Sequence, residues 1–139
     1  MAVSTDPLAM LTEVNGLAAF NRWAGIEVTA ADEGTAEIQM SWREEFGQYT
    51  GFLHAGLVSA LIDTACGFAA ATLAGISLLA SHCAVNYLSP AVGQLFLSRA
   101  RVVKAGKRQI FVSADLLAQW QGQWKAVASG ETILIRADD

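Results

Sequence analysis

An aspartate inside an otherwise apolar segment is the residue of this chain best placed to do chemistry. Asp63 follows the run Leu-Val-Ser-Ala-Leu-Ile, and residues 57–73 predict a helix that carries it. An ionised carboxylate among aliphatic side chains is costly unless its charge is paired or used. Two interpretations stay open from this segment alone: Asp63 is a structural hydrogen-bond acceptor, or it is a reactive carboxylate.

The loop that enters this helix runs from Gln48 to Gly56 and contains His54. A helix start presents unpaired backbone N–H groups and the positive end of the helix dipole, which together suit a negatively charged oxygen. The same dipole disfavours a charged imidazole, so we expect His54 to act as a neutral hydrogen-bonding group. A carboxylate and an oxyanion-binding helix start on one element predict hydrolytic chemistry.

Small residues share the predicted helix face that carries Asp63. At 100° per residue, four of them fall within about 40° of the aspartate, namely Ser59, Gly67, Ala70 and Ala74. Larger side chains, Leu57 and Phe68 among them, fall on the far side. We therefore expect the Asp63 face to leave room for a ligand or for the backbone of a partner.

Other reactive chemistries find little support in the sequence. Ser59 lacks the G-x-S-x-G context of a serine nucleophile, and Gly51 and Gly56 do not form a phosphate-binding fingerprint. His54 and His82 are the only two histidines, and no third metal ligand accompanies them. We therefore expect neither a serine hydrolase nor a metal site.

Composition indicates a protein with part of its surface covered. Only 16% of the 139 residues are charged while 53% are hydrophobic, whereas roughly a quarter are charged in a typical soluble domain. The simplest cover is another copy of the chain, so we expect a homodimer or homotetramer. The net charge of −4 argues against a nucleic-acid partner.

Basic residues concentrate in one later segment. Five of the nine lysines and arginines lie between positions 99 and 108, namely Arg99, Arg101, Lys104, Lys107 and Arg108. Charges of this kind often keep a strand edge soluble. The functional alternative is a site for the phosphates of a cofactor tail, and the cluster alone does not decide between the two.

Cysteine usage and hydropathy indicate a cytoplasmic protein. Cys66 and Cys83 lie in apolar stretches, so we expect buried free thiols in a reducing compartment. Residues 1–6 lack the basic and apolar regions of a signal peptide. The apolar run 56–80 is interrupted by Asp63 and rich in alanine and glycine, so we expect no membrane span.

Local patterns predict the elements. Asp6-Pro7 begins one helix that continues to Gly25, since an aspartate cap and a proline suit a helix start. Residues 26–32 and 35–42 alternate around Glu33-Gly34, which indicates a hairpin. Four more alternating segments, joined by short turns, indicate an antiparallel meander: 80–88, 95–103, 110–118 and 124–136. We expect an α+β fold over residues 1–139, one domain in which a curved antiparallel sheet of about six strands wraps one long helix.

The chain resembles the hotdog-fold thioesterases in the order of its elements. It also shares their local pattern, in which G-x-x-H-x-G opens the long helix and an acid follows nine residues after the histidine. The most similar group is the PaaI-type (phenylacetate-degradation) and 4-hydroxybenzoyl-coenzyme A thioesterases. Their first motif is matched by Gln48, Gly51, residues 54–56 and residues 61–65. Val-Asn-Tyr-Leu-Ser-Pro-Ala at 85–91 and Val-Val-Lys-Ala-Gly-Lys-Arg at 102–108 resemble two further motifs.

The resemblance implies hydrolysis of an acyl-coenzyme A thioester to a free acid, with coenzyme A as part of the substrate and no other cofactor. It implies that Asp63 is the nucleophile or the general base and that the N–H of Ala55, with that of Gly56, holds the thioester oxygen. Gln48 would orient water or the thioester, and His54 would shape the loop. The remaining residues assigned to substrate or coenzyme A are Arg101, Lys107, Arg108, Ser59, Gly67 and Asn86.

The resemblance also implies a site between two protomers, so that Asp63 of one chain faces residues of its partner. One position departs from the family pattern, because Ala55 stands where glycine is usual. Alanine keeps the N–H group, but a positive φ angle there would be strained. Two alternative functions stay open: a hotdog protein that binds acyl-coenzyme A or fatty acid without catalysis, and a hotdog enoyl-coenzyme A hydratase or dehydratase using His54 and Asp63.

Overall fold

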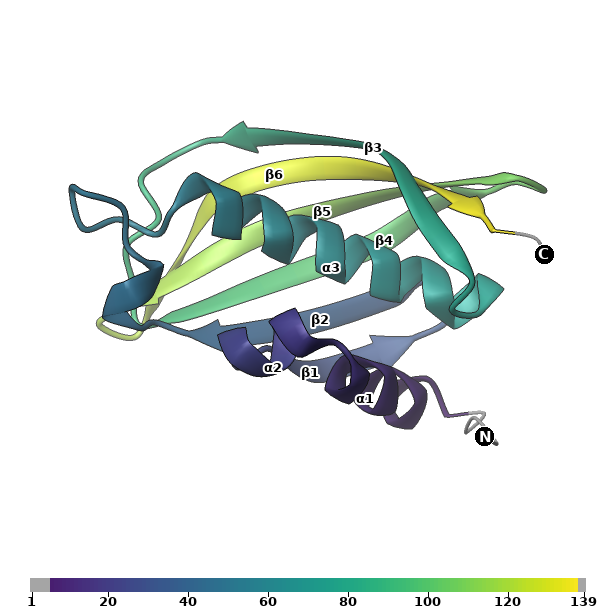
Figure 1. Cartoon of the computed structure of the whole chain (residues 1–139). Coiled ribbons are helices and arrows are strands. Elements are labelled where there is room, and N and C mark those ends of the chain that lie inside the picture. The colour runs from purple at the N-terminus through teal and green to yellow at the C-terminus, as the bar shows by residue number, and fades with distance from the viewer. Residues whose placement is uncertain (1–5, 138–139) are drawn as a thin grey trace.

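A six-stranded antiparallel sheet curves around one long helix in the computed structural model of the chain, which describes residues 6–137 (Figure 1). The strand order is β1-β2-β4-β5-β6-β3. The strands are β1 (Glu27–Asp32), β2 (Thr35–Ser41), β3 (Leu78–Tyr87), β4 (Leu95–Ala105), β5 (Gln109–Trp120) and β6 (Gln123–Arg136). The helices are α1 (Pro7–Leu17), α2 (Ala19–Ala24), the short 3-10 helix η1 (Glu44–Phe46) and the long α3 (Ala55–Ala74). The expected α+β hotdog fold is thereby confirmed.

The N-terminal helical segment is two helices where the sequence predicted one. The predicted start is confirmed, because the Asp6 side chain accepts a hydrogen bond from the Ala9 N–H at 3.0 Å and Pro7 takes the first position. Ala18 then adopts an extended conformation with φ −86° and ψ 114°, and α2 begins after it. Gly25 ends α2 with a φ of 72°. The absence of a signal peptide was inferred from residues 1–6, of which residues 1–5 lie outside the described part of the chain.

The predicted meander of four strands is correct for β4, β5 and β6 but wrong for β3. This strand pairs with β6 at the far edge of the sheet, with Leu78 opposite Arg136 and Tyr87 opposite Ala128. Strand β4 pairs instead with β2 of the N-terminal hairpin. Alternation along a strand shows which side chains share a face, but it carries no information about which strand lies alongside.

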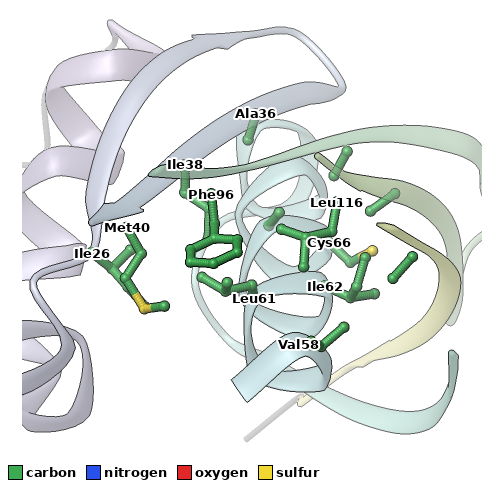
Figure 2. Packing of buried hydrophobic residues seen from close by; sticks show 14 of the residues in the cluster. Ile26, Ala36, Ile38, Met40, Val58, Leu61, Ile62, Cys66, Phe96 and Leu116 are labelled. Atoms are coloured by element: carbon green, nitrogen blue, oxygen red, sulfur yellow. The ribbon is translucent and has the colours of Figure 1, made fainter. Parts of the chain in front are cut away.

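The core lies between α3 and the concave face of the sheet (Figure 2). Phe96 and Leu116 from the strands are fully buried against Leu61 and Ile62 of the helix. Cys66 is buried as expected, whereas the expectation for Cys83 was wrong because it lies exposed on the edge strand β3. Helix α3 is long and apolar enough to cross a membrane, but it is the core helix of this fold, with half of its apolar stretch buried.

Close approach of α3 to the sheet requires a glycine on β6. A Cβ atom added to Gly130 would lie 2.7 Å from the Ala84 carbonyl oxygen and 2.8 Å from Cγ2 of Ile62. Both distances are shorter than van der Waals contact, and the crowding involves backbone as well as side chain. A side chain at position 130 would therefore push the helix away from β6 or separate β6 from β3.

We expect Gly130→Ala to lower the free energy of unfolding by about 1–3 kcal/mol, because overpacking of a filled core forces backbone shifts. The matched control is Gly16→Ala, at an exposed position of α1 where an added Cβ would meet nothing within 4 Å. That substitution should stabilise the chain by about 0.5–1 kcal/mol, since alanine is the better helix former. Chemical denaturation of the two variants measures both values, and equal stability would contradict the close approach.

Candidate functional site

The loop before α3 is a tight turn that fixes the amide of Gln48. Gln48 Oε1 accepts hydrogen bonds from both the N–H and the hydroxyl group of Thr50. Gly51 closes the turn with a φ of 89°, and its N–H donates to the Gln48 carbonyl oxygen at 2.9 Å. Since its side-chain oxygen is occupied, Gln48 can offer a ligand only the N–H donors of its amide.

His54 caps the first turn of α3. Its Nδ1 atom accepts a hydrogen bond from the Gly56 N–H at 2.8 Å. An imidazole nitrogen that accepts carries no proton, so this bond places the ring proton on Nε2. His54 therefore presents a donor and not a base. The bond also occupies the Gly56 N–H, which leaves Ala55 as the amide of this pair available for an oxyanion.

Ala55 is the first residue of α3, and it is exposed. Its N–H donates to no group within residues 6–137. Gln121 is the one residue other than glycine with a positive φ in the described chain, so the backbone of Ala55 avoids the left-handed region. Alanine in place of the family's glycine is thus unstrained here. The backbone donor is preserved.

A cavity of about 460 Å³ opens beside this helix start. Gln48, His54 and Ala55 lie on its wall together with Tyr87 and residues 88–91, the end of the Val-Asn-Tyr-Leu-Ser-Pro-Ala motif. The Tyr87 hydroxyl lies 2.7 Å from Oγ of Ser59. It also donates to the Ala55 carbonyl oxygen at 3.5 Å. The sequence indicated Tyr87 as a member of the motif and as a residue that influences pocket depth; its contact with α3 depends on the position of the edge strand.

Asp63 lies in a different cavity, of about 290 Å³. Its wall includes Gly67 and Phe68 of α3, Asn21 of α2 and the first residues of β3. The carboxylate is half-buried and receives no hydrogen bond from the described residues. Burial raises the pKa of Asp63 above its ordinary range, because desolvation disfavours the charged form. No donor in the described chain supports the interpretation of Asp63 as a structural acceptor.

The expected stripe of small residues is correct in part. Gly67 borders the Asp63 cavity, but Ala70 is fully buried in the core. Phe68, expected on the far side, lies on the wall of the cavity. The sheet wraps more of the helix circumference than a one-sided helical wheel assumes, so the open sector is narrower. The long Phe68 side chain borders that sector.

The two halves of the candidate site are separated within one chain. Asp63 lies eight residues after Ala55, which corresponds to about 12 Å along the helix axis. The same spacing rotates the two residues by about 80° around the helix. One thioester carbonyl cannot contact both the Ala55 N–H and the Asp63 carboxylate of the same chain.

Of the residues assigned to substrate or coenzyme A, Gly67 lines the Asp63 cavity, whereas the basic residues and Asn86 do not. Lys107 and Arg108 lie in the β4–β5 turn, at the end of the sheet opposite the start of α3 (Figure 1). Arg136, which the sequence did not single out, lies beside them and donates to the Gly106 carbonyl oxygen at 3.4 Å. Arg101 and Asn86 line a groove of about 560 Å³ on the convex face of the sheet, turned away from α3.

Comparison with known proteins adds one family match and three similar proteins. The family described as the thioesterase superfamily matches residues 50–124. A solved thioesterase family protein from Silicibacter pomeroyi is 31% identical, with 90% of this chain and 93% of that chain covered and a TM-score of 0.87. The E. coli PaaI protein of the phenylacetic acid degradation operon is 26% identical, with 92% and 94% covered and a TM-score of 0.78. A protein of Saccharolobus solfataricus, provisionally named an esterase, is 25% identical over 133 residues, 94% of each chain.

Burial of Asp63 without a partner should cost stability when the group ionises. Its raised pKa means that the folded chain holds the proton more tightly than the unfolded chain, so stability falls as pH rises through the interval above 3.8. Asp63→Asn should therefore stabilise the fold at neutral pH, by at most about 1 kcal/mol because water screens the half-exposed carboxylate. Well below pH 3.8 the difference should vanish.

Thermal unfolding across pH measures this effect. The matched control is Asp32→Asn at the exposed end of β1, where the side chain accepts from the Glu33 N–H, a role that asparagine keeps. A destabilised Asp63→Asn protein at neutral pH would mean that the carboxylate has a donor in the folded chain.

Proposed function

Since this chain belongs to the thioesterase superfamily, we propose that it hydrolyses an acyl-coenzyme A thioester to the free acid and coenzyme A, in a site shared by two copies of the chain. The observation that carries the proposal is that α3 holds two polar groups with free hydrogen-bonding capacity. The Ala55 N–H and the Asp63 carboxylate both lack hydrogen-bond partners in the described chain. They are of the types needed to hold an oxyanion and to activate an attacking group.

A second copy would solve the separation of these two groups. Strand β3 is an edge of the sheet, and most of its side chains are exposed, Leu79 and Tyr87 among them. Pairing of two β3 edges about a two-fold axis would cover this surface and place the two α3 helices antiparallel. Asp63 of one chain would then approach Ala55 of the partner subunit. The low charged fraction of the chain supports such a pairing.

The proposed reaction follows from the groups at this composite site. Asp63 acts as general base by taking a proton from water while the water oxygen bonds to the thioester carbon, or it attacks that carbon itself and forms an anhydride that water cleaves. In both routes the carbonyl oxygen becomes negative and is held by the Ala55 N–H. Such a donor typically contributes about 3 kcal/mol to the transition state. Return of that charge breaks the C–S bond, which gives the acid in the first route and the anhydride in the second. The thiolate takes up the proton that Asp63 removed from water or, in the second route, a proton of the water that cleaves the anhydride.

Two further side chains have proposed roles in this step. Gln48 has only its amide N–H groups to offer, so it donates to the thioester oxygen or to the oxygen of the attacking water. His54 holds the first turn of α3 through Gly56 and so keeps the Ala55 N–H directed out of the helix. Neither role requires a metal ion. A reducing cytoplasm is the proposed location.

We expect Asp63→Asn to lower kcat for acyl-coenzyme A hydrolysis by about a hundredfold or more, because positioned general bases contribute factors of that size. Asp32→Asn, exposed at the far end of the β1–β2 hairpin, should leave kcat unchanged. Thiol release measured over a panel of short, medium, long and aromatic acyl groups provides the test. Turnover by Asp63→Asn equal to that of the unmodified protein would refute a catalytic carboxylate.

A mixing experiment tests whether the site is shared. Ala55→Pro removes the donor and fits the backbone, because proline is favoured at the first helical position and His54 before it has φ −58° and ψ 135°. The Asp63→Asn and Ala55→Pro proteins should each be inactive alone. After subunit exchange, half of the dimers are mixed and each has one intact composite site, so activity should return to about a quarter of the unmodified level. Mixtures that stay inactive would place both groups in one chain.

The basic turn should matter only for substrates that carry the nucleotide. Lys107→Gln with Arg108→Gln should raise KM for an acyl-coenzyme A about tenfold, since each phosphate contact of this kind contributes about 1 kcal/mol or less at an exposed site. The KM for the same acyl group on N-acetylcysteamine should not change. Lys125→Gln, exposed at the opposite end of β6, is the control. Equal effects on both substrates would show that the turn acts through the fold.

A further inference from the structure

We infer that the cavity beside Asp63 selects acyl groups that carry a hydrogen-bond donor, of which a hydroxyl group is the smallest, and that the side-chain oxygen of Asn21 accepts from it. The inference rests on the proposed function, because it assigns this cavity to the acyl part of the substrate. Asp63 and Asn21 line the same cavity, Asp63 from α3 and Asn21 from α2. An acyl group attacked at Asp63 would therefore extend toward Asn21.

Asn21 is unusual among the residues of this cavity. It is only 7% exposed, one of three buried polar residues in the described chain. Most of the cavity wall is apolar, with Val14, Phe68 and Leu134 among its residues. A buried amide on an apolar wall must satisfy its polar atoms or leave them for a ligand.

A chain of hydrogen bonds fixes which atom of Asn21 is left. The Ile26 carbonyl oxygen can only accept, so Asn15 must present its NH₂ group to it, at 2.8 Å. The Asn15 oxygen then faces Asn21, which must present its own NH₂ group, at 2.9 Å. Asn21 Oδ1 is left over, and it receives no hydrogen bond within residues 6–137. The orientation of an asparagine amide is ordinarily ambiguous, but here a backbone carbonyl determines it through two links.

Asn21 lines the cavity and its NH₂ group is turned to Asn15, so the inference assigns Oδ1 to the cavity wall as its hydrogen-bond acceptor. An apolar acyl chain that fills it would remove water from Asn21 Oδ1 and leave the acceptor unsatisfied. A hydroxyl group on the acyl chain would donate to the same atom and restore the bond. A substrate that carries only an acceptor at that position, such as a methyl ether, would meet oxygen with oxygen. At the chain length that reaches Asn21, we expect the acyl group with a hydroxyl to be bound and hydrolysed best. The unsubstituted group should come next, and the methoxy group should be equal to it or worse.

The test uses matched acyl thioesters that end in hydrogen, hydroxyl or methoxy, over chain lengths from butanoyl to octanoyl. At the chain length that reaches Asn21, kcat/KM for the thioester that carries the hydroxyl group should exceed that of the unsubstituted thioester by about tenfold. The ratio of dissociation constants for the corresponding non-hydrolysable thioethers, measured by calorimetry, should show the same preference without turnover. Hydroxyl and unsubstituted compounds that are equal at every length, in both measurements, would overturn the inference.

Three variants separate recognition by Asn21 from a role in folding. Asn21→Leu keeps the approximate size and removes the acceptor, so the hydroxyl preference should disappear while the unsubstituted ester is still processed. Asn15→Ala leaves Asn21 in place but releases its orientation, so the preference should fall severalfold; a purely structural Asn21 would show no change in this ratio. Thr64→Val removes the hydroxyl group of another residue on the cavity wall and should leave the ratio unchanged. Thermal unfolding confirms that each variant is folded.

The outcomes also separate this inference from the proposed function. Absence of hydrolysis for every ester would refute the thioesterase proposal, while the thioether binding ratio would still decide the role of Asn21. Hydrolysis of all esters without a hydroxyl preference would uphold the proposed function and overturn the inference. Loss of the preference in Thr64→Val but not in Asn21→Leu would assign recognition of the hydroxyl group to Thr64. That result would also overturn the inference.

Discussion

The sheet has to enclose one apolar helix, and its curvature, the packing of the core and the position of Asp63 follow from that requirement. Helix α3 has buried residues around much of its circumference, so a flat sheet on one side could not cover it. The strands therefore have to twist and curve, and the sheet reaches around the helix from β2 to β3. Contact is so close at β6 that only glycine fits at position 130. The part of the helix that the sheet leaves uncovered is the part that carries Asp63.

The polar groups near α3 fall into those whose hydrogen bonds are complete within the chain and those that keep capacity for a ligand. The oxygen of Gln48 and the N–H of Gly56 belong to the first group. The N–H of Ala55, the carboxylate of Asp63 and the oxygen of Asn21 belong to the second. A buried or half-buried group without a partner costs stability unless a ligand uses it. These unpaired donors and acceptors thus mark where the complementary acceptors and donors of a substrate would lie.

Spacing along the helix makes these groups dependent on a second copy. A rise of about 12 Å between Ala55 and Asp63 is too long for one carbonyl group to bridge. In a two-fold pair, Asp63 of each chain would meet the start of α3 of the other chain. Each chain would therefore supply the carboxylate of one site and the oxyanion-binding N–H of the second site. Substrate binding and chain pairing would then depend on the same edge of the sheet, so a weakened dimer would also be a weakened enzyme.

Features encoded by neighbouring residues could be predicted from the amino-acid sequence. The Asp6-Pro7 start, the hairpin at Glu33-Gly34 and the long helix of residues 57–73 could be predicted because caps, turns and periodicity are local. Asp63, His54 and the departure at Ala55 were visible for the same reason, and the short motifs that carry the family resemblance are also local.

The fold of the whole chain set the features that no short stretch of sequence encodes. It placed β3 beside β6, broke the N-terminal helix at Ala18 and put Asn86 and Arg101 on the face of the sheet away from α3. It also separated Asp63 from Ala55 into two cavities and brought Asn21 to the cavity of Asp63. No local pattern marks Asn21, because its significance comes from the link through Asn15 to Ile26 and from a helix that begins more than thirty residues later. The physical reason is that strand pairing and cavity shape follow from the packing of the whole chain, whereas helix caps and turns follow from a few adjacent residues.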